Sequence, residues 1–350
     1  MNKNMKKSKR LQEDERQSRE QERQKREMMR QEKRLIREAN KKLVYAPKKT
    51  RRSLGLMCLD PDGVMHFSDG RWMKVYRVEG DCDNLPGLAA DLQSRVLFTD
   101  RIKNGKEERF LTLSLDGDTY EMVRRGFAAD EKCLAEMNIR AMSFEELVNA
   151  VRDMTHSCSG NDERISFTYE EFMKKREDLE TVFFPSVTEE YERFRIDDHY
   201  GTSLFVMQYP DSCDNSVIRE LKEAEGIDDL VISIGIHKVS PQERALHLKN
   251  LKRRYETDIL NDQVEPFINA SIRTSVFGEN DEILGTICHK TEQSFLRNGF
   301  MIAPGFGDQR ESICSQLSLG IKQYGSFRNM TEKALREFFR REYGHDSDKI

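Results

Sequence analysis

Two glycine-containing stretches could in principle bind phosphate groups. A phosphate-binding loop needs two glycines five positions apart, followed by Lys and Ser or Thr, because backbone N–H groups and the Lys ammonium converge on the phosphates. The Gly-Lys pair at 105–106 has Asp at position 100 and Glu at position 107, so this loop is absent. Gly305-Phe306-Gly307 begins like a dinucleotide fingerprint, but Arg310 occupies the third glycine position, and we interpret the stretch as a turn. The sequence therefore predicts no nucleotide cofactor.

Three further clusters hold nucleophilic or metal-binding residue types. His156 and Cys158 could form a base–nucleophile pair, but no orienting acid lies nearby. Asp197-Asp198-His199 could bind a metal, but such a site needs three or four ligands from at least two elements, and no second cluster answers it. The run 81–84 lacks the glycine and closing Glu of a calcium loop. We therefore predict no catalytic residues, no metal and no enzyme activity.

Charge is distributed unevenly along the 350 residues, whose net charge is −4. Residues 1–52 carry 20 Lys/Arg and 8 Asp/Glu, a net of +12, whereas the remainder carries 38 and 54, a net of −16. A basic arm of this kind favours an anionic partner, such as nucleic acid, a membrane surface or an acidic protein. An alternative interpretation is a solvated helix that only aids solubility.

The arm is predicted to be helical over residues 9–43, because helix-forming residues dominate and neither Pro nor Gly interrupts them. Its apolar residues are too sparse for a coiled-coil seam. Pro47–Arg52 is predicted as a hinge. The residues proposed to contact an anionic partner are basic and lie in the second half of the arm or in the hinge: Arg23, Lys25, Arg26, Arg30, Arg34, Lys48, Lys49, Arg51 and Arg52.

Cysteine usage and hydropathy suggest a location. The seven cysteines are scattered and odd in number, which is typical of reduced thiols in a cytosolic protein. Uncharged stretches such as Tyr200–Pro210 are far shorter than the ~18–20 apolar residues of a membrane helix. We expect a cytoplasmic protein, placed peripherally at the cytoplasmic face of the membrane if the arm binds lipid.

The first predicted lobe covers residues 53–154. Turn residues at 60–63 and 68–70 predict a β-hairpin from Val64–Phe67 and Trp72–Val78, and Arg109–Leu115 alternates like a strand. Leu88, Leu92 and Val96 lie at helical spacing. Ser143 with Glu146 forms a capping box, which predicts a helix start.

A polar linker with a short helix is predicted over 155–193, and a second lobe over 194–331. This lobe alternates predicted strands with predicted helices, including a helix over Pro241–Leu260 and a buried strand over Leu230–His237. A charged helix and tail follow over 332–350. The expected fold is α+β: two lobes, each with a split βαβ (ferredoxin-like) arrangement, behind a long charged helix.

Several local strings and their order resemble the N-terminal, pre-motor domain of the TraE/TrbE-type conjugative-transfer ATPases of type IV secretion systems. The strings that carry this resemblance span roughly residues 54–331: Asp69-Gly70-Arg71-Trp72, Arg109-Phe110-Leu111-Thr112, Met154-Thr155-His156-Ser157-Cys158, Phe194-Arg195-Ile196, His199-Tyr200-Gly201, Gln316-Leu317-Ser318-Leu319-Gly320 and Arg328-Asn329-Met330-Thr331. The chain departs from the family where Ser318 replaces a proline, and where a charged helix over Glu332–Tyr343 replaces the motor domain.

The resemblance implies a docking role without ATP hydrolysis. Its expected partners are inner-membrane channel subunits, motor subunits of the secretion apparatus and further copies of the chain. The main alternative is a DNA-binding accessory factor of conjugative transfer that acts through residues 3–52, although the arm lacks aromatic residues for base stacking. An unrecognised enzyme is a third class, and it would require a pocket with convergent, perturbed acids.

Overall fold

The computed structural model describes residues 23, 27–31, 34, 44–45, 56–103, 106–155, 168–174, 187–196, 199–210, 214–255, 267–316 and 327–339. The chain divides into two units, Met1–Leu43 and Val44–Ile350. In the first unit Arg23, Glu27–Gln31 and Arg34 are helical and exposed, and the other residues of the predicted helix lie outside the described part of the chain.

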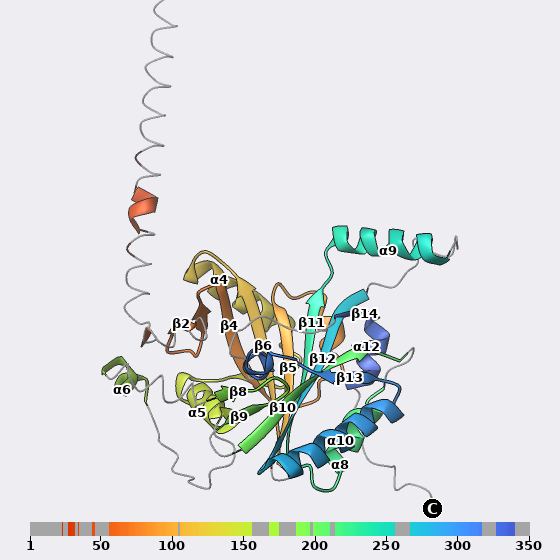
Figure 1. The fold of residues 1–350 in the computed structure, drawn as a ribbon. Coiled ribbons are helices and arrows are strands. Elements are labelled where there is room, and N and C mark those ends of the chain that lie inside the picture. The colour runs from red at the N-terminus through yellow and green to blue at the C-terminus, as the bar shows by residue number, and fades with distance from the viewer. Residues whose placement is uncertain are drawn as a thin grey trace, which may run out of the picture. The chain divides into compact units, whose positions relative to one another are not determined.

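The second unit combines helices with one large antiparallel sheet, which confirms the α+β class (Figure 1). Its described helices are α3 (Leu85–Ala89), α4 (Tyr120–Cys133), α5 (Phe144–Thr155), α6 (Tyr169–Lys174), α8 (Ser216–Glu223), α9 (Pro241–Tyr255), α10 (Asp281–Arg297), α11 (Gln309–Gln316) and α12 (Glu332–Phe339). The described residues contribute 14 strands to the sheet: β1 (Val44–Tyr45), β2 (Leu56–Leu59), β3 (Met65–Phe67), β4 (Arg71–Val78), β5 (Arg95–Lys103), β6 (Lys106–Asp116), β7 (Ile139–Ala141), β8 (Val187–Glu189), β9 (Phe194–Ile196), β10 (His199–Gln208), β11 (Asp229–Lys238), β12 (Phe267–Gly278), β13 (Met301–Pro304) and β14 (Arg328–Thr331).

Strand order divides the sheet into two halves that meet at one ladder. The first half has the order β7-β4-β6-β5, and the second has the order β11-β12-β10-β13. The halves meet where their inner strands, β5 and β11, pair antiparallel, with Val96 opposite Ile236 and Lys103 opposite Asp229. The ranges predicted as two lobes, 53–154 and 194–331, therefore contribute to a single continuous sheet.

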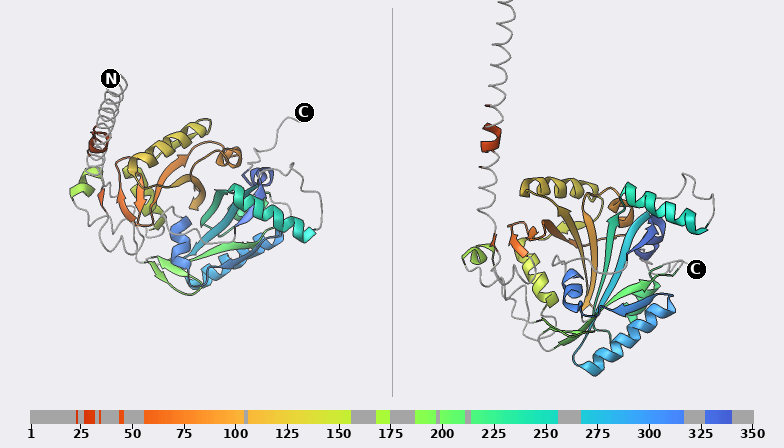
Figure 2. Two further views of the ribbon diagram at one scale, coloured as in Figure 1. Left: turned by 90° about the horizontal axis from the view of Figure 1, so that it is seen from above. Right: turned by 45° about the horizontal axis from the view of Figure 1, so that its top comes forward.

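The two faces of the sheet bury different cores. Alternation along β5 sends Val96, Phe98 and Ile102 to one face, where α3, α4, α8, α10 and α12 pack against the sheet. The opposite face contains Phe110 and Val231 and is covered by α5 and α11, and residues of β2 and β3 contribute to the same core. Views from two further directions show the helices distributed on both sides of the sheet (Figure 2).

Local hydrogen bonds start several helices where the sequence predicts them. The Ser143 N–H donates to Glu146 Oε2 at 3.0 Å, and the Glu146 N–H donates to Ser143 Oγ at 3.2 Å, so the predicted capping box at α5 is confirmed. Gly299 follows α10 with φ +79°, the left-handed conformation that glycine adopts without strain.

The β2–β3–β4 region and β6 agree with the sequence pattern. Met65 lies opposite Met73 and His66 opposite Trp72, which confirms the predicted hairpin. β6 confirms the predicted strand over Arg109–Leu115, and Leu111 and Leu113 share its buried face.

Helical spacing of Leu88, Leu92 and Val96 was a misleading signal. The helix α3 ends at Ala89, and Val96 lies in β5. The carboxylate of Asp130, from α4, accepts hydrogen bonds from the N–H groups of Gln93 at 2.8 Å and Ser94 at 3.1 Å. These bonds fix the segment that connects α3 to β5. Three apolar residues four positions apart cannot reveal such a non-local contact.

Two segments near predicted boundaries also join the body. The strand β8 lies within the range predicted as a linker and pairs with β9. The helix α12, within the predicted charged C-terminal segment, buries Leu335, Phe338 and Phe339 in the core. Among the described residues, no helix combines the length and the apolar character needed to cross a membrane.

Candidate functional site

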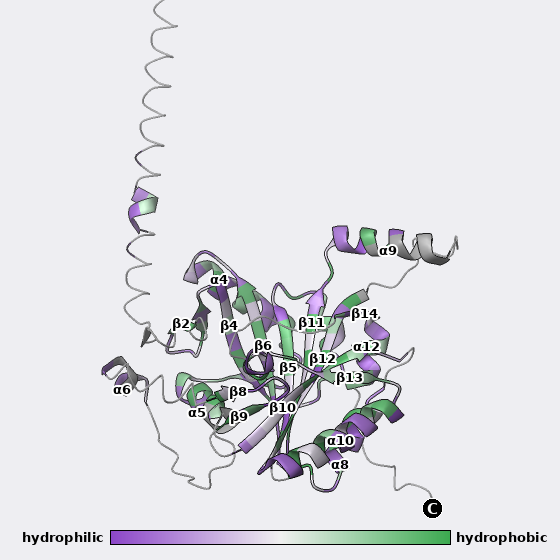
Figure 3. Ribbon diagram, viewed as in Figure 1, coloured by the Kyte–Doolittle hydropathy of each residue, from purple (hydrophilic) through white to green (hydrophobic). Residues whose placement is uncertain are grey.

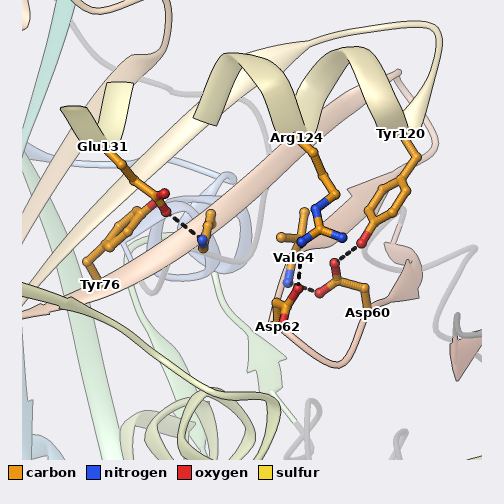
Figure 4. A network of polar contacts seen from close by, with 8 residues as sticks. Asp60, Asp62, Val64, Tyr76, Tyr120, Arg124 and Glu131 are labelled. Atoms are coloured by element: carbon orange, nitrogen blue, oxygen red, sulfur yellow. Dashed lines mark hydrogen bonds and ion pairs between the residues drawn. The ribbon is translucent and has the colours of Figure 1, made fainter. Parts of the chain in front are cut away.

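Asp60 lies in the turn between β2 and β3 and is the centre of a polar network with α4. The Val64 N–H donates to Asp60 Oδ1 at 2.7 Å, and the Tyr120 hydroxyl donates to Asp60 Oδ2 (Figure 4). Burial raises the pKa of Asp60 above its usual value, although both hydrogen bonds oppose that rise. Arg124 pairs with Asp62 at 3.2 Å. The network joins α4 to the β2–β3 turn, which is a structural role.

A second part of this network is centred on Glu131 of α4. Its Oε1 atom accepts hydrogen bonds from Lys74 Nζ at 2.6 Å and from the Tyr76 hydroxyl at 2.8 Å, both on β4 (Figure 4). Burial raises the pKa of the Tyr76 hydroxyl, and the neighbouring carboxylate of Glu131 adds to the rise. The hydroxyl therefore stays protonated and serves as a hydrogen-bond donor.

The buried thiols are poor nucleophiles. Burial, with a smaller contribution from Asp60, raises the pKa of Cys58 to about 12, and burial raises the pKa of Cys314 to about 12. Cys58 Sγ lies 3.9 Å from His66 Nδ1, but His66 stacks on Trp72 with its pKa lowered by burial. A thiol with a raised pKa is protonated near neutral pH and reacts slowly.

The structure describes only some of the chemically suggestive motifs of the sequence. His156, Cys158, Asp197 and Asp198 lie outside the described residues. Gly307 has φ +71° and donates its N–H to the Tyr191 carbonyl at 2.8 Å, so the glycine pair forms a turn. No group of three or more metal-ligand side chains occurs within the described ranges.

The junction of the two halves carries an ion cluster that the sequence did not indicate. Lys222 Nζ, from α8, lies 2.5 Å from Asp100 Oδ2 and 2.9 Å from Glu107 Oε1. Asp100 belongs to β5 and Glu107 to β6. The helix α8 of the second half therefore forms ion pairs with two strands of the first half. Burial raises the pKa of Asp100, partly offset by the Lys222 ammonium.

A buried arginine lies close to this junction, on the face of the sheet that α11 covers. Arg273 of β12 is 4% exposed and lies opposite Ser233 of β11, which in turn lies opposite Thr99 of β5. Arg273 Nη1 donates to Ser315 Oγ, and the Gln316 carbonyl accepts from Thr99 Oγ1 at 3.1 Å. The last turn of α11 therefore lies over a row of polar sheet residues.

A basic helix, α9, exposes most of the side chains that the structure describes in its first half. It begins with a capping box, in which Ser240 and Glu243 exchange hydrogen bonds of 2.9 and 3.2 Å. Leu246 is 61% exposed, and the helix stands away from the sheet (Figures 1 and 2). Its first turns carry both hydrophilic and hydrophobic positions (Figure 3). The sequence of α9 contains one acidic residue, Glu243, and five basic residues: Arg244, Lys249, Lys252, Arg253 and Arg254.

An exposed aromatic pair occupies a second surface. Tyr191 is 68% exposed and Phe306 is 50% exposed, and their ring centroids lie 5.4 Å apart. Tyr191 precedes β9 and Phe306 follows β13, so the hydrogen bond from Gly307 to Tyr191 holds two loops together. Paired exposed aromatic side chains are typical of protein contact surfaces.

The basic contacts predicted from the sequence are described only in part. Arg23, Arg30 and Arg34 are exposed on helical backbone, as an interaction with a partner requires. Lys25, Arg26, Lys48, Lys49, Arg51 and Arg52 lie outside the described residues. The structure thus leaves the role of the arm as a prediction.

Sequence reasoning missed Arg273 and the exposure of α9, although each had a signal. Arg273 interrupts the alternating strand Ser271–Phe277 at a position whose neighbours two residues away face the interior. The α9 sequence combines leucines with a basic C-terminal half, a pattern typical of helices that bind an anionic surface. No protein-family model matches the chain, and no curated protein matches it either.

Proposed function

We propose that the chain is a non-catalytic adaptor or assembly subunit that binds other proteins of a conjugative, type IV secretion-like DNA-transfer apparatus. The observation that carries this proposal is α9, a basic helix whose Leu246 is 61% exposed. Its partner would be an acidic surface on a motor subunit or on an inner-membrane channel subunit. The chain would act in the cytoplasm, at the cytoplasmic face of the membrane.

The physical argument concerns the stability of α9. Isolated helices of about 12–15 residues or fewer are marginal in water. α9 has 15 residues, and its first turn is held by the capping box rather than by burial of Leu246. A partner that covers Leu246 while facing Lys249 would gain both apolar burial and charge complementarity. Grooves that bind amphipathic helices use this combination.

The resemblance to pre-motor domains of conjugative ATPases supports the same role. We propose that each half of the sheet is a split βαβ (ferredoxin-like) unit. In support, β4-α3-β5-β6-α4-β7 and β10-α8-β11-β12-α10-β13 have the same order along the chain and equivalent strand positions in the sheet. A duplicated unit would give a rigid platform from which α9 projects.

The rival function is DNA binding by the basic arm. The exposed helical positions Arg23, Arg30 and Arg34 are compatible with phosphate contacts. Neutralised phosphates give a steep loss of affinity with salt, whereas a contact based on apolar burial does not. Steeply salt-dependent DNA binding that is lost on removal of residues 1–43 therefore identifies the rival function.

The test measures binding of the purified full-length chain to purified motor and channel cytoplasmic domains by isothermal titration calorimetry. Leu246→Asp should weaken binding at least tenfold, because it places a charge in the contact. Leu296→Asp is the matched control, since Leu296 is 59% exposed on α10. We expect it to bind like the unaltered chain.

Three results would contradict the proposal. The first is that neither subunit binds. The second is that both Asp variants bind unchanged. The third is tight, magnesium-dependent binding of ATP, which would indicate a motor-like activity. DNA binding that is steeply salt-dependent and is lost when residues 1–43 are removed would support the rival instead.

A further inference from the structure

Arg273 is a buried cation that no carboxylate of the described residues neutralises. Among the described residues, Ser315 Oγ is the hydrogen-bond acceptor for Arg273 Nη1, and neither Nε nor Nη2 has a partner. No acidic side chain of the described chain pairs with it within 4.0 Å. Burial lowers the pKa of Arg273 to about 10, although the side chain remains charged at neutral pH. A buried, unpaired charge is costly, so the arrangement is incomplete in energetic terms.

Other orphaned polar groups gather around the same row of the sheet. The Ser233 hydroxyl, in register between Thr99 and Arg273, is buried and has no hydrogen-bond partner. The carboxamide nitrogen and oxygen of Gln316, which is fully buried, also have none. Buried polar groups in native proteins are usually satisfied by protein, by water or by a ligand, so the cluster offers hydrogen-bonding groups to a ligand.

The first turn of α11 provides a contrast. Gln309 Oε1 accepts the Ser203 N–H at 2.7 Å, and Gln309 Nε2 donates to the Ser203 carbonyl at 3.1 Å and to the Gly305 carbonyl at 3.0 Å. The helix is therefore anchored on β10 at its start with every amide atom satisfied. The unsatisfied groups are confined to its last turn, at Gln316.

We propose that Arg273, Ser233, Ser315 and Gln316 form an oxyanion-binding site beneath the last turn of α11. The unpartnered atoms of Arg273, Nε and Nη2, form one edge of the guanidinium, and two parallel N–H bonds from such an edge match two oxygens of a phosphate or carboxylate. The hydroxyl of Ser233 and the amide nitrogen of Gln316 supply further donors. The ligand class is a phosphate group, free or carried by a larger molecule, or a carboxylate.

Entry requires a small movement of α11. Four of the six buried side chains of α11 are polar, and Ile313 and Cys314 are the apolar ones. An element with few buried apolar contacts opens locally more easily. Displacement of the last turn exposes the guanidinium edge, and an anion that binds there then holds the turn in place. The site would couple α11 to an anionic ligand, which goes beyond the adaptor role.

The test is a titration of the full-length chain with inorganic phosphate, sulfate or acetate, in sodium chloride of matched ionic strength at pH 7. We expect saturable one-to-one binding and a rise in Tm with phosphate. Saturable binding of acetate but not of phosphate would assign the site to a carboxylate ligand. Arg273→Met should lose at least tenfold in affinity. Arg125→Met, which removes an exposed arginine of α4, is the matched control and should bind like the unaltered chain.

Two outcomes would overturn the proposal. The first is that the unaltered chain binds none of the three anions saturably. An equal response in the unaltered chain, Arg273→Met and Arg125→Met is the other, and it would mean an adventitious ion only. Should Arg273→Met fail to fold, Gln316→Leu decides the question, because it removes the orphaned amide without removing the charge. Unchanged affinity in that variant would also contradict the site as drawn.

Discussion

Lys222 Nζ of α8 lies 2.5 Å from Asp100 Oδ2 of β5, so one ion pair joins the two halves of the sheet. Asp100 is buried, whereas Lys222 is about one quarter exposed. The ammonium partly offsets the effect of burial on the pKa of Asp100. The pair therefore makes the junction sensitive to the loss of either partner.

Lys222→Met should lower the free energy of unfolding by about 2 kcal/mol at pH 7, because it leaves a buried carboxylate without its cation. The loss should shrink as the pH falls and Asp100 becomes protonated. Urea denaturation measures both effects. Arg297→Met, which removes an exposed pair with Glu220 at 3.1 Å, should cost less than about 1 kcal/mol. Equal losses in the two variants would contradict a special role for the junction pair.

Asp60→Asn should change how stability depends on pH. The folded pKa of Asp60 is raised, so its protonated form is favoured in the folded state. The stabilising contribution is complete below the usual carboxyl pKa of 3.8 and is lost as the pH rises through the folded pKa. The variant should therefore gain stability relative to the unaltered chain as the pH rises from about 4 towards neutrality. Thermal unfolding between these pH values measures the difference, and a constant difference would refute it.

Two glycine-to-alanine substitutions should change the free energy of unfolding in opposite directions. A Cβ at Gly201 of β10 would lie 2.4 Å from Phe194 Cζ, so Gly201→Ala should destabilise the fold by about 1–3 kcal/mol through overpacking. A Cβ at Gly285 of α10 meets nothing within 4 Å, so Gly285→Ala should stabilise by up to about 1 kcal/mol through helix propensity. Chemical denaturation of both variants tests the pair together. Stabilisation by Gly201→Ala would contradict the close approach of Phe194, and destabilisation by Gly285→Ala would contradict the open space at that position.

Phe338→Ala should show that α12 belongs to the core. Phe338 is buried and packs against Phe300, with ring centroids 6.3 Å apart, so its removal should cost about 3–5 kcal/mol. Lys333→Ala, on the exposed side of the same helix, should change stability by less than about 0.5 kcal/mol. A small effect at Phe338, measured by urea denaturation, would mean that α12 packs only loosely.

Local features of this fold were predictable because their signals are local. The Ser143–Glu146 capping box and the turn residues before Trp72 act within a few residues, and both predictions are confirmed. The pairing of β5 with β11 was not predictable, since two apolar strands of similar length carry no mark of their partner. The end of α3 depends on Asp130, which is distant in sequence.

In the candidate site, too, features with local signals were predictable and features assembled from distant residues were not. The sequence indicated that Arg23, Arg30 and Arg34 lie on helical backbone, and those positions are helical. It did not indicate the row from Thr99 to Arg273, because that row is assembled from three strands and only their pairing places the residues side by side. The exposure of α9 likewise depends on what the rest of the chain leaves uncovered.

The ladder between β5 and β11 has a consequence during synthesis on the ribosome. Residues 104–228, 125 in number, must be translated before β11 begins, and until then the inner edge of β5 has no strand to pair with. An unpaired strand edge recruits other chains readily. The emerging first half therefore exposes an unpaired strand edge throughout this interval, and slower translation would lengthen the time available for aggregation.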